Sequence, residues 1–313
     1  MSSPEVTRLH AVVIGGGNMG ADIAAILAAH RYGLALVEPD RERWPKLRER
    51  IAVAARQLGA SVDGESLALA SVSAKVEWES VDLVIECAPE RLDLKQAIFA
   101  ELERLAPREA ILASNSSSYP ITDITRGLAT RERMLGLHFF LPAHLVPAVE
   151  VIRGEGTDEA IWRRVAEIVR SWGKVPVMVR KDLPGFLANR IQHALMREAF
   201  ALIDAGLASP EDVDNAVRYG FGFRYLAAGP ILQKDLAGLD VHHAAATTMY
   251  PHLANNAAPS PTLARLVAEG KLGMKTGAGF YAWTAESAKT ERERYERDLA
   301  DALAILKRSL PSP

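Results

Sequence analysis

The feature that most constrains the fold of this chain is a glycine-rich turn between an apolar strand and an apolar helix. The strand pattern AVVI at residues 11–14 is followed by GGGNMG at residues 15–20 and then by ADIAAILAAH, whose apolar residues recur at helical spacing. Gly15 permits the tight turn, Gly17 lets a pyrophosphate approach the backbone, and Gly20 lets the helix pack on the strand. The pattern predicts a dinucleotide-binding βαβ unit.

A second strand, LALVE, ends in a carboxylate about twenty residues after the glycines, at the position where an acid binds the ribose 2′-hydroxyl. This residue, Glu38, would repel the 2′-phosphate of NADP. Arg41 and Arg43 could answer such a phosphate, but on the following helix such residues more often face solvent. The sequence predicts NAD as the cofactor, bound by the turn with its helix-start residues Asn18 and Met19 and by Glu38.

The rest of the first half alternates apolar strands with helical segments. Further strands are predicted at residues 81–88, 110–115, 134–140, 148–152 and 175–179. Such alternation predicts an α/β fold with a Rossmann-type, mostly parallel, doubly wound sheet, which binds ligands outside the carboxyl ends of its strands. We assign residues 1–183 to this NAD-binding domain.

The second half has a different pattern, which begins where proline and glycine interrupt the chain at residues 184–185. Residues 186–206 read as a long amphipathic helix, Ser209 is a good N-cap before a proline, and residues 229–250 read as one further helix. We assign residues 184–313 to an all-helical substrate and dimerisation domain. Its apolar surface has no other evident partner, so we expect a homodimer.

Residue types suited to proton transfer gather between residues 113 and 150. A serine and asparagine cluster at residues 114–118 precedes His138 in LGLHFFLP, and Glu150 follows in PAVEV. A histidine, with an ordinary pKa of about 6.5, can take an alcohol proton, and a carboxylate on its other nitrogen stabilises the imidazolium. From these residues alone a catalytic and a buried structural histidine are equally open, because the facing of Glu150 depends on strand pairing.

Other polar residues carry weaker signals. Asn189 lies in the helical segment PGFLANR, where an outward position is favoured over one in the interdomain cleft. His242 and His243 have no carboxylate or cysteine at metal-ligand spacing, so we predict no metal site. Residues 290–298, TERERYERD, are typical of a solvated helix face.

Composition narrows the partners. Thirty-seven Lys and Arg residues against 39 Asp and Glu residues give a net charge of −2, which favours neither nucleic acid nor an anionic membrane. The single cysteine, Cys87, excludes an intrachain disulfide, is read as core packing and argues for a reducing compartment. Residues 1–10 lack a signal-peptide pattern and no window is long and apolar enough to span a membrane, so we expect a cytoplasmic protein with a small-molecule substrate.

Seven motifs together resemble the 3-hydroxyacyl-CoA dehydrogenase family, in order and along nearly the whole chain. They are GGGNMG with Glu38, SNSSS, GLHFFLP, VEVI, DLPGFLANR, AAGPILQKDLAGLD and KTGAGFY. The resemblance implies a Rossmann-type domain, a helical domain that dimerises, and hydride transfer between NAD and the 3-hydroxyl carbon of the substrate. It also favours a functional role for Asn189.

By position, the resemblance implies roles for four residues around the substrate. His138 becomes the general base and Glu150 the carboxylate that pairs with it. Ser117 and Asn189 become the groups around the substrate oxygen.

The resemblance also implies cofactor contacts that the residues alone do not indicate. Glu90 and Lys95, in CAPERLDLK, match the pair that contacts the ribose and phosphates in the family. Asn115 matches a residue beside the nicotinamide, and Lys275 matches a second lysine near the cofactor. Without the resemblance, Lys95 and Lys275 would be ordinary surface charges.

The chain departs from the family where substrate choice is made. Leu141 stands where the family usually has asparagine, and the segment between residues 38 and 72 is short, with Lys46 as its one lysine where relatives that use coenzyme A carry a basic hairpin. His144 and Pro147 look more like the subgroup acting on free acids, with L-gulonate 3-dehydrogenase, L-carnitine dehydrogenase and the pyridine-carboxylate dehydrogenase of vitamin B6 degradation. We therefore favour a small free 3-hydroxy acid over an acyl-CoA such as 3-hydroxybutyryl-CoA.

Two further readings compete with this one. The chain could be a non-catalytic NAD-binding protein with a structural or sensor role, although the His138 and Glu150 pair argues against lost activity. It could also be an enzyme of the same fold that acts on a hydroxymethyl or aldehyde group.

Overall fold

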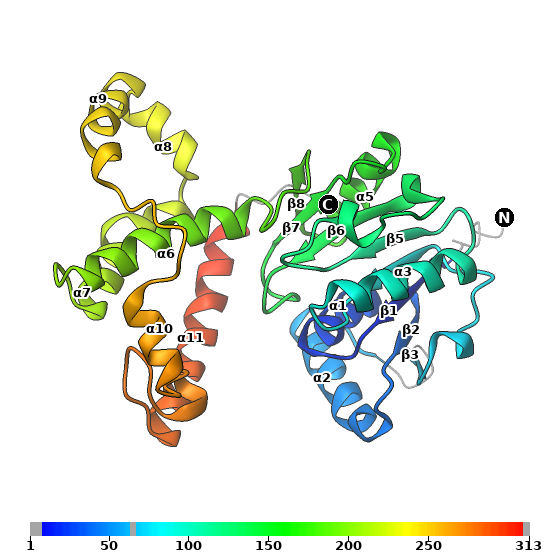
Figure 1. Cartoon of the computed structure of the whole chain (residues 1–313). Coiled ribbons are helices and arrows are strands. Elements are labelled where there is room, and N and C mark those ends of the chain that lie inside the picture. The colour runs from blue at the N-terminus through cyan, green and yellow to red at the C-terminus, as the bar shows by residue number, and fades with distance from the viewer. Residues whose placement is uncertain (1–7, 63–66, 309–313) are drawn as a thin grey trace. The chain divides into compact units, whose positions relative to one another are not determined.

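The computed structural model describes residues 8–62 and 67–308, which form two compact units that meet in sequence between Asn189 and Arg190 (Figure 1). The boundary predicted after residue 183 falls slightly earlier, just before the helix that carries the chain into the second unit. The functions assigned to the two domains stay predictions.

The described part of the first unit contains an eight-stranded sheet in the order β3-β2-β1-β4-β5-β6-β7-β8. The strands are β1 (His10–Ile14), β2 (Gly33–Val37), β3 (Leu67–Ala70), β4 (Leu83–Glu86), β5 (Ile111–Ser114), β6 (Met134–Phe139), β7 (Ala148–Ile152) and β8 (Val175–Val179). Neighbouring strands are parallel except β6 and β7, so β7 and β8 run opposite to the rest. The predicted Rossmann-type fold is confirmed.

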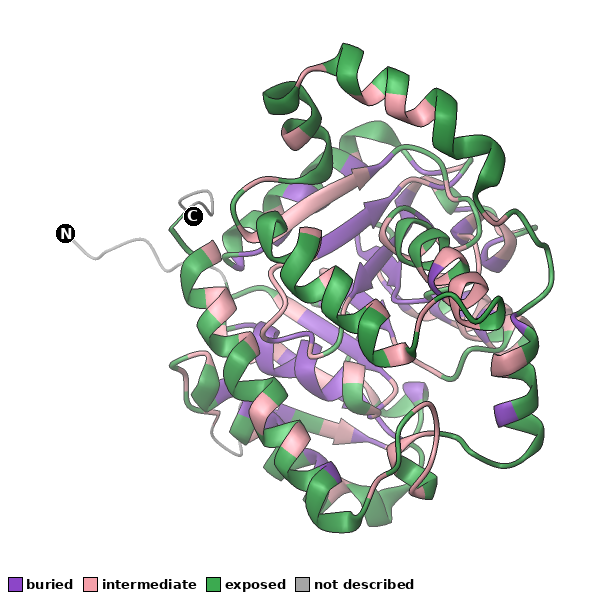
Figure 2. Ribbon diagram, turned by 90° about the vertical axis from the view of Figure 1, so that its left-hand side faces the viewer, coloured by how far each residue is buried: buried purple, intermediate pink, exposed green. Residues whose placement is uncertain are grey.

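Helices cover both faces of this sheet, so its strands are buried on both sides. On β1, Ala11 and Val13 join one apolar cluster and Val12 and Ile14 join the other, as side chains alternate along a strand. The first cluster lies under α1 (Asn18–Ala29), α2 (Trp44–Gln57) and α5 (Glu159–Ser171), and the second under α3 (Leu92–Leu105) and α4 (Ile121–Ile124). Figure 2 shows buried residues concentrated in the strands.

The strand directions bring several polar segments to one edge of the sheet. The parallel strands β1, β2, β4, β5 and β6 all end at this edge, where the glycine turn, Glu38 and the serine cluster follow them. Because β7 is antiparallel to β6, its first residues lie at the same edge, and Glu150 pairs directly with His138. The topology thus assembles the predicted site from residues far apart in sequence.

One strand was not predicted and one predicted helix is wrong. The unpredicted strand is β3, whose four residues, LALA, contain no β-branched or aromatic residue that would mark them as a strand. The single helix expected at residues 229–250 is two helices, because the chain turns at Gly238, whose φ of 99° no helix can contain. The other predicted strands agree with the structure within a few residues at each end.

The second unit is helical throughout its described residues. Its helices are α6 (Ala188–Asp204), which begins in the first unit, α7 (Pro210–Asn215), α8 (Pro230–Ala237), α9 (Leu239–Met249), α10 (Pro261–Ala268) and α11 (Ala285–Leu306). The N-cap predicted at Ser209 is confirmed, with a capping box to Asp212 and proline at the first position. The charged run 290–298 lies within α11, where Arg294 pairs with Glu291 and Asp298.

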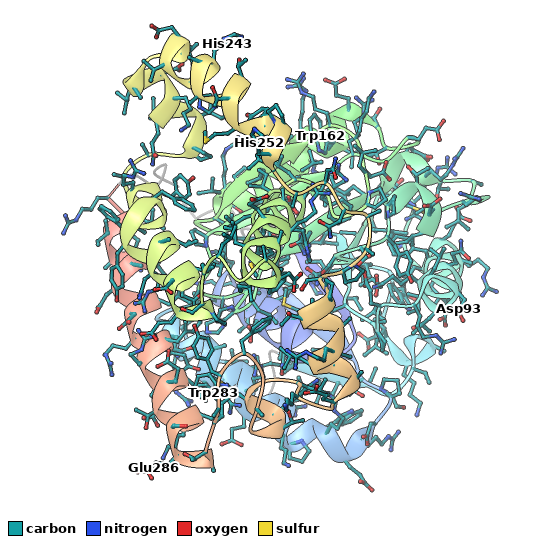
Figure 3. The ribbon with its side chains drawn as sticks, turned by 60° about the vertical axis from the view of Figure 1, so that its left-hand side comes forward. Asp93, Trp162, His243, His252, Trp283 and Glu286 are labelled. Atoms are coloured by element: carbon teal, nitrogen blue, oxygen red, sulfur yellow. The ribbon has the colours of Figure 1, made fainter. Side chains whose placement is uncertain are left out.

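The described residues show neither a metal-binding group nor a membrane span. Within residues 8–62 and 67–308, no cluster of three or more His, Cys, Asp or Glu side chains is placed to hold a metal ion. His243 projects from α9 and is exposed (Figure 3). No helix among those residues combines the length and apolarity needed to cross a bilayer.

Candidate active site

The glycine turn forms a tight passage between β1 and α1. Gly15 has a φ of 104°, and a Cβ there would lie 2.7 Å from the carbonyl oxygen of Cys87. A Cβ on Gly20 would lie 1.9 Å from the carbonyl oxygen of Gly15, so a side chain at either position would displace backbone. A Cβ on Gly17 would meet nothing within 4 Å, which leaves open space beside the turn.

The N-terminus of α1 faces this space without a side-chain cap. Gly17 is the N-cap residue and supplies no acceptor, and the first turn, which contains Asn18 and Met19, has no acidic residue. The uncapped N–H groups and the helix dipole therefore favour an anion. This arrangement fits the pyrophosphate of a dinucleotide.

Glu38 follows β2 and is held close against the turn. Its Oε2 accepts a hydrogen bond from Gly16 N at 3.1 Å, and its Oε1 accepts one from Asp40 N at 3.1 Å. Arg43 lies 3.3 Å from Oε2, with its side chain 54% exposed. Sequence reasoning did not single out Gly16, where a Cβ would lie 2.7 Å from Leu47 Cδ2 and 2.8 Å from Glu38 Oε2, so those side-chain ends would have to move.

His138 and Glu150 form a buried pair across β6 and β7. His138 Nδ1 lies 2.7 Å from Glu150 Oε2, and the two residues are 3% and 0% exposed. Glu150 Oε1 accepts hydrogen bonds from Leu187 N at 3.0 Å and Ala188 N at 2.8 Å, where α6 begins. Burial acts to raise the pKa of Glu150, but the bonds from His138 and Ala188 outweigh it and hold the pKa below its ordinary value.

The other nitrogen of His138 faces the serine turn. His138 Nε2 lies 3.2 Å from Ser117 Oγ, and Asn189 Nδ2 lies 3.5 Å from the carbonyl oxygen of Ser117. The aromatic rings of Phe140 and Phe186 lie 4.8 and 5.7 Å from the imidazole, centroid to centroid. Four residues predicted to surround the substrate thus lie together, with the imidazole between a carboxylate and a hydroxyl.

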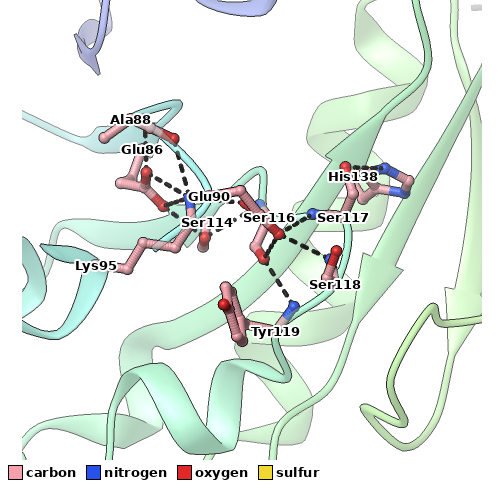
Figure 4. Close-up of polar contacts among 10 residues, drawn as sticks. All are labelled: Glu86, Ala88, Glu90, Lys95, Ser114, Ser116, Ser117, Ser118, Tyr119 and His138. Atoms are coloured by element: carbon pink, nitrogen blue, oxygen red, sulfur yellow. Dashed lines mark hydrogen bonds and ion pairs between the residues drawn. The ribbon is translucent and has the colours of Figure 1, made fainter. Parts of the chain in front are cut away.

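Glu90 and Lys95 lie beside this group (Figure 4), and Asn115 is the residue between Ser114 and Ser116 in the serine cluster. Asn115 Oδ1 accepts a hydrogen bond from Phe139 N at 2.9 Å, which ties the asparagine to the end of β6. Lys95 Nζ lies 3.3 Å from Glu90 Oε2 and is 1% exposed, so the alternative of an ordinary surface charge is wrong. Burial acts to raise the pKa of Glu90, but bonding to Ser116 and the charge of Lys95 outweigh it and lower the pKa.

Lys275 lies in the second unit, in a short 3-10 turn (Met274–Thr276), and is exposed. Its contact with the cofactor stays a prediction. Cys87 packs against the apolar cluster under α1, in agreement with its reading as a core residue, and burial raises the pKa of its thiol.

A second buried network lies under the loop that follows His138 and was not predicted. Asp22 of α1 is 0% exposed, accepts a hydrogen bond from Ala143 N at 3.0 Å and pairs with Arg50 at 2.9 Å. Lys174 Nζ donates to the carbonyl oxygens of Ala143, His144 and Val146, and burial lowers its pKa to about 8. These contacts fix the loop that carries Leu141, which is itself 56% exposed.

Two family models match the chain in succession. The model for the NAD-binding domain of 3-hydroxyacyl-CoA dehydrogenase matches residues 10–183, and the model for the C-terminal domain of the same family matches residues 185–283. The first match agrees with the uncapped helix and open glycine turn, and NAD is the cofactor.

Three curated relatives are similar over most of the chain. The 5-formyl-3-hydroxy-2-methylpyridine 4-carboxylate 5-dehydrogenase of Mesorhizobium japonicum is 33% identical over 94% of this chain and 97% of its own length. The mitochondrial hydroxyacyl-coenzyme A dehydrogenase of Homo sapiens is 34% identical over 90% of this chain and 93% of its own. The 3-hydroxyadipyl-CoA dehydrogenase of Escherichia coli is 36% identical over 88% of this chain but only 59% of its own.

Solved structures agree with these relatives. A crystal structure of the same kind of pyridine-carboxylate dehydrogenase, described as an NAD⁺-dependent dismutase, has a TM-score of 0.90 at 30% identity, over 96% of this chain and 99% of that one. A 3-hydroxybutyryl-CoA dehydrogenase from Escherichia coli has a TM-score of 0.71 at 33% identity, over 89% of this chain and 60% of that one. The predicted resemblance, including its subgroup, is confirmed, and the protein is an enzyme, an oxidoreductase. Both family models and the relatives show that the chain belongs to the 3-hydroxyacyl-CoA dehydrogenase family.

Proposed function

We propose that this enzyme oxidises the 3-hydroxyl group of a small free hydroxy acid, and catalyses the reverse reduction, with His138 as the general acid and base. The observation that carries the proposal is the placement of the His138 imidazole, with Nδ1 2.7 Å from Glu150 and Nε2 3.2 Å from Ser117 Oγ. A base with one nitrogen held by a carboxylate and the other facing a hydroxyl is suited to removing an alcohol proton.

The residues of the chain divide the work of this reaction. His138 Nε2 takes the hydroxyl proton, and Glu150 stabilises the imidazolium that forms. Ser117 and Asn189 hold the substrate oxygen as its charge changes. When bound, NAD supplies the two-electron oxidant for the alcohol carbon.

We assign the cofactor to the glycine turn and its surroundings. Gly15, Gly17 and Gly20 with the N-terminus of α1 would receive the pyrophosphate, and Glu38 the adenosine ribose. The remaining predicted contacts are Asn18, Met19, Glu90, Lys95, Asn115 and Lys275.

The free acid is favoured over an acyl-CoA by the relatives and by Leu141. The Mesorhizobium relative is named for a pyridine carboxylate and is similar along 97% of its length, whereas the human and Escherichia coli relatives are named for acyl-CoA substrates. Leu141 places an exposed apolar side chain where the family usually has an amide. An apolar group cannot replace the hydrogen bonds of that amide.

A substrate panel at fixed NAD concentration tests this proposal. We expect higher kcat/KM for free 3-hydroxy acids, such as carnitine and gulonate, than for 3-hydroxybutyryl-CoA. A preference for the thioester would instead assign the chain to acyl-CoA oxidation. The panel includes a formyl pyridine carboxylate, because the Mesorhizobium relative is named for one. If the enzyme turns over that compound alone, its substrate is an aldehyde and not a 3-hydroxy acid. NAD binding without turnover of any compound would favour a sensor or structural role.

We expect the native enzyme to prefer NAD to NADP, and Glu38→Gln to weaken that preference by about tenfold or more, because like charges in contact cost several kcal/mol. Glutamine keeps an acceptor for Gly16 N or Asp40 N, so the turn should stay folded. The measurement is kcat/KM with each cofactor for both proteins. Equal use of NADP by the native enzyme would contradict the assignment.

We further propose a homodimer formed through the second unit. Among its described residues only Ala199, Ser260, Leu266 and Ala288 are buried, too few to form a core. Large apolar side chains on α8 are instead exposed, with Ile231 at 77% and Leu236 at 76%. An apolar groove of about 880 Å³ lies beside them, lined by Phe223, Tyr225, Leu236 and Ile305 among others. A second copy of the same face would bury this surface.

Leu236→Asp is expected to convert the dimer to a monomer or an unstable chain, because the charge would have to be buried in the contact. Sedimentation velocity gives the mass of each form. Val53→Asp, at an exposed apolar position on α2 of the first unit, is the control and should remain dimeric. A native protein with the mass of one chain would contradict the proposal.

The cytoplasmic location predicted from the sequence is retained as part of the proposed function.

A further inference from the structure

A buried ion pair lies under the serine turn, and one of its members has no role in the proposed reaction. Glu86 is the last residue of β4 and is 0% exposed. Lys95, in the first turn of α3, is 1% exposed, and its Nζ lies 2.8 and 3.0 Å from the two carboxylate oxygens of Glu86. Figure 4 shows both side chains beside the serines.

The ammonium group of Lys95 contacts three residues of the protein. Besides Glu86, its Nζ contacts the carbonyl oxygen of Ala88 at 3.2 Å and Glu90 Oε2 at 3.3 Å. An ammonium has three hydrogens to donate. Because the acceptors include Glu86 and Glu90, Lys95 joins two carboxylates, one on β4 and one after it.

Glu86 reaches the serine turn through Ser114. The two residues are paired in register as the last residues of β4 and β5, so their side chains lie on the same face. Ser114 Oγ donates to Glu86 Oε2 at 2.6 Å and accepts a hydrogen bond from Ser116 N at 3.2 Å. Glu86 thus fixes the point where the turn leaves the sheet.

Glu90 holds the same turn from its other side. Its Oε1 accepts hydrogen bonds from Ser116 Oγ at 2.7 Å, Ser117 N at 3.1 Å and Ser118 N at 2.9 Å. The turn is therefore bound by two carboxylates that Lys95 connects. The Ser117 hydroxyl, which this turn carries, lies 3.2 Å from His138 Nε2.

We propose that Glu86 is a positioning residue, which acts through Lys95 and Ser114 to fix the serine turn so that Ser117 Oγ faces His138 Nε2. The inference rests on the proposed function, in which that hydroxyl holds the substrate oxygen. The presence of a buried ion pair is weak evidence that it stabilises the fold, because apolar residues of similar volume often stabilise a protein equally well. What apolar residues would not supply here is the directed bond to Ser114.

A double-mutant cycle tests whether Glu86 acts through Ser117. Ser114→Ala removes one hydroxyl and leaves the ion pair intact, and Glu86→Gln removes the charge. We expect each to lower kcat roughly 5- to 10-fold, the scale of one lost orienting hydrogen bond. Ser114→Ala leaves Lys95 in its ion pair and should also change the KM for NAD little. In a Ser117→Ala background, the same substitutions should have almost no further effect on kcat. A general loss of folding would instead lower activity equally in both backgrounds.

A second readout needs no turnover. The chain has eight histidines, so in protein labelled with ¹⁵N-histidine the His138 signal is the one that disappears in His138→Gln. Ser117→Ala, Ser114→Ala and Glu86→Gln should all shift its Nε2 resonance. The control is Glu103→Gln, which alters another carboxylate that holds a turn, through Thr130 N at 2.7 Å and Oγ1 at 2.9 Å. Thr130 precedes β6, at the opposite edge of the sheet from His138, so this variant should leave both readouts unchanged.

Failure of the two proposals can be told apart. Suppose that the native enzyme turns over a hydroxy acid. If Ser114→Ala and Glu86→Gln then keep the native kcat, or lower kcat as much in the Ser117→Ala background as in the native one, Glu86 is not a positioning residue. An unshifted His138 resonance in both variants leads to the same conclusion. If the native chain oxidises no hydroxy acid, the proposed function is wrong, and the resonance alone then decides whether Glu86 orders the turn.

Discussion

Replacing His138 by alanine is expected to reduce kcat by about 100-fold or more, the usual scale for the loss of a general base. The side chain is 3% exposed and lies between Glu150 and Ser117, so its loss removes the base from the proposed path of the proton. The dissociation constant for NAD should change little, because the glycine turn and Glu38 do not contact the imidazole. Steady-state kinetics and NAD titration separate these two effects.

His138→Gln is the matched variant for this prediction. Glutamine can still donate a hydrogen bond to Glu150 but cannot accept the proton, so its activity should be as low as that of alanine while its stability stays closer to the native value. His252→Ala, at an exposed histidine of the second unit (Figure 3), should keep full activity. Near-native turnover in either His138 variant would remove this residue from the mechanism.

Much of the first unit follows from patterns that are local in sequence. Strand β1, the glycine turn and α1 each carry their signal within a few residues, and apolar runs mark β4 to β8. Parallel strands then place the ends of β1, β2, β4, β5 and β6 at one edge without further information. This is why the glycines, Glu38, the serine cluster and His138 could be assigned to one side of the sheet.

The pairing of His138 with Glu150 could not be predicted in the same way. It depends on β7 running antiparallel to β6 and on a register that places the two residues opposite each other. A shift of one residue would have turned Glu150 to the other face of the sheet. The bonds from Leu187 and Ala188 to Glu150 depend in addition on where α6 begins.

Charged residues that are buried were the hardest to recognise. Lys95, Lys174 and Asp22 look like surface charges in the sequence, and their burial follows from partners far along the chain. Lys174 takes its acceptors from a loop about thirty residues earlier, and Asp22 is contacted from residue 143. For Glu86 the sequence offers only a weak signal, a carboxylate that ends an apolar strand nine residues before a lysine. Only the folded topology makes these pairs.

Glu150→Gln is expected to lower kcat by about 100-fold or more while leaving NAD affinity unchanged. Glutamine is similar in shape, and its oxygen can still accept from Leu187 N and Ala188 N. It carries no charge to stabilise the imidazolium of His138, and its amide can leave the ring in the wrong tautomer, the cause of a loss of about 10⁴ when an asparagine replaces the aspartate of a serine-protease triad. Activity that stays within a fewfold of the native enzyme would show that the carboxylate is not needed.

The same substitution has a second signature in the pH dependence of stability. The pKa of Glu150 in the folded enzyme lies below its ordinary value of 4.5, so the folded state favours the carboxylate. Its contribution to the free energy of unfolding is therefore fully present above about pH 4.5 and is lost as the pH falls through the lower folded pKa. Denaturant unfolding at a series of pH values should give a difference between the native enzyme and Glu150→Gln that shrinks as the pH falls below about 4.5. A difference that grows over that acid range would mean that burial, and not the bonds from His138 and the start of α6, dominates the environment of Glu150.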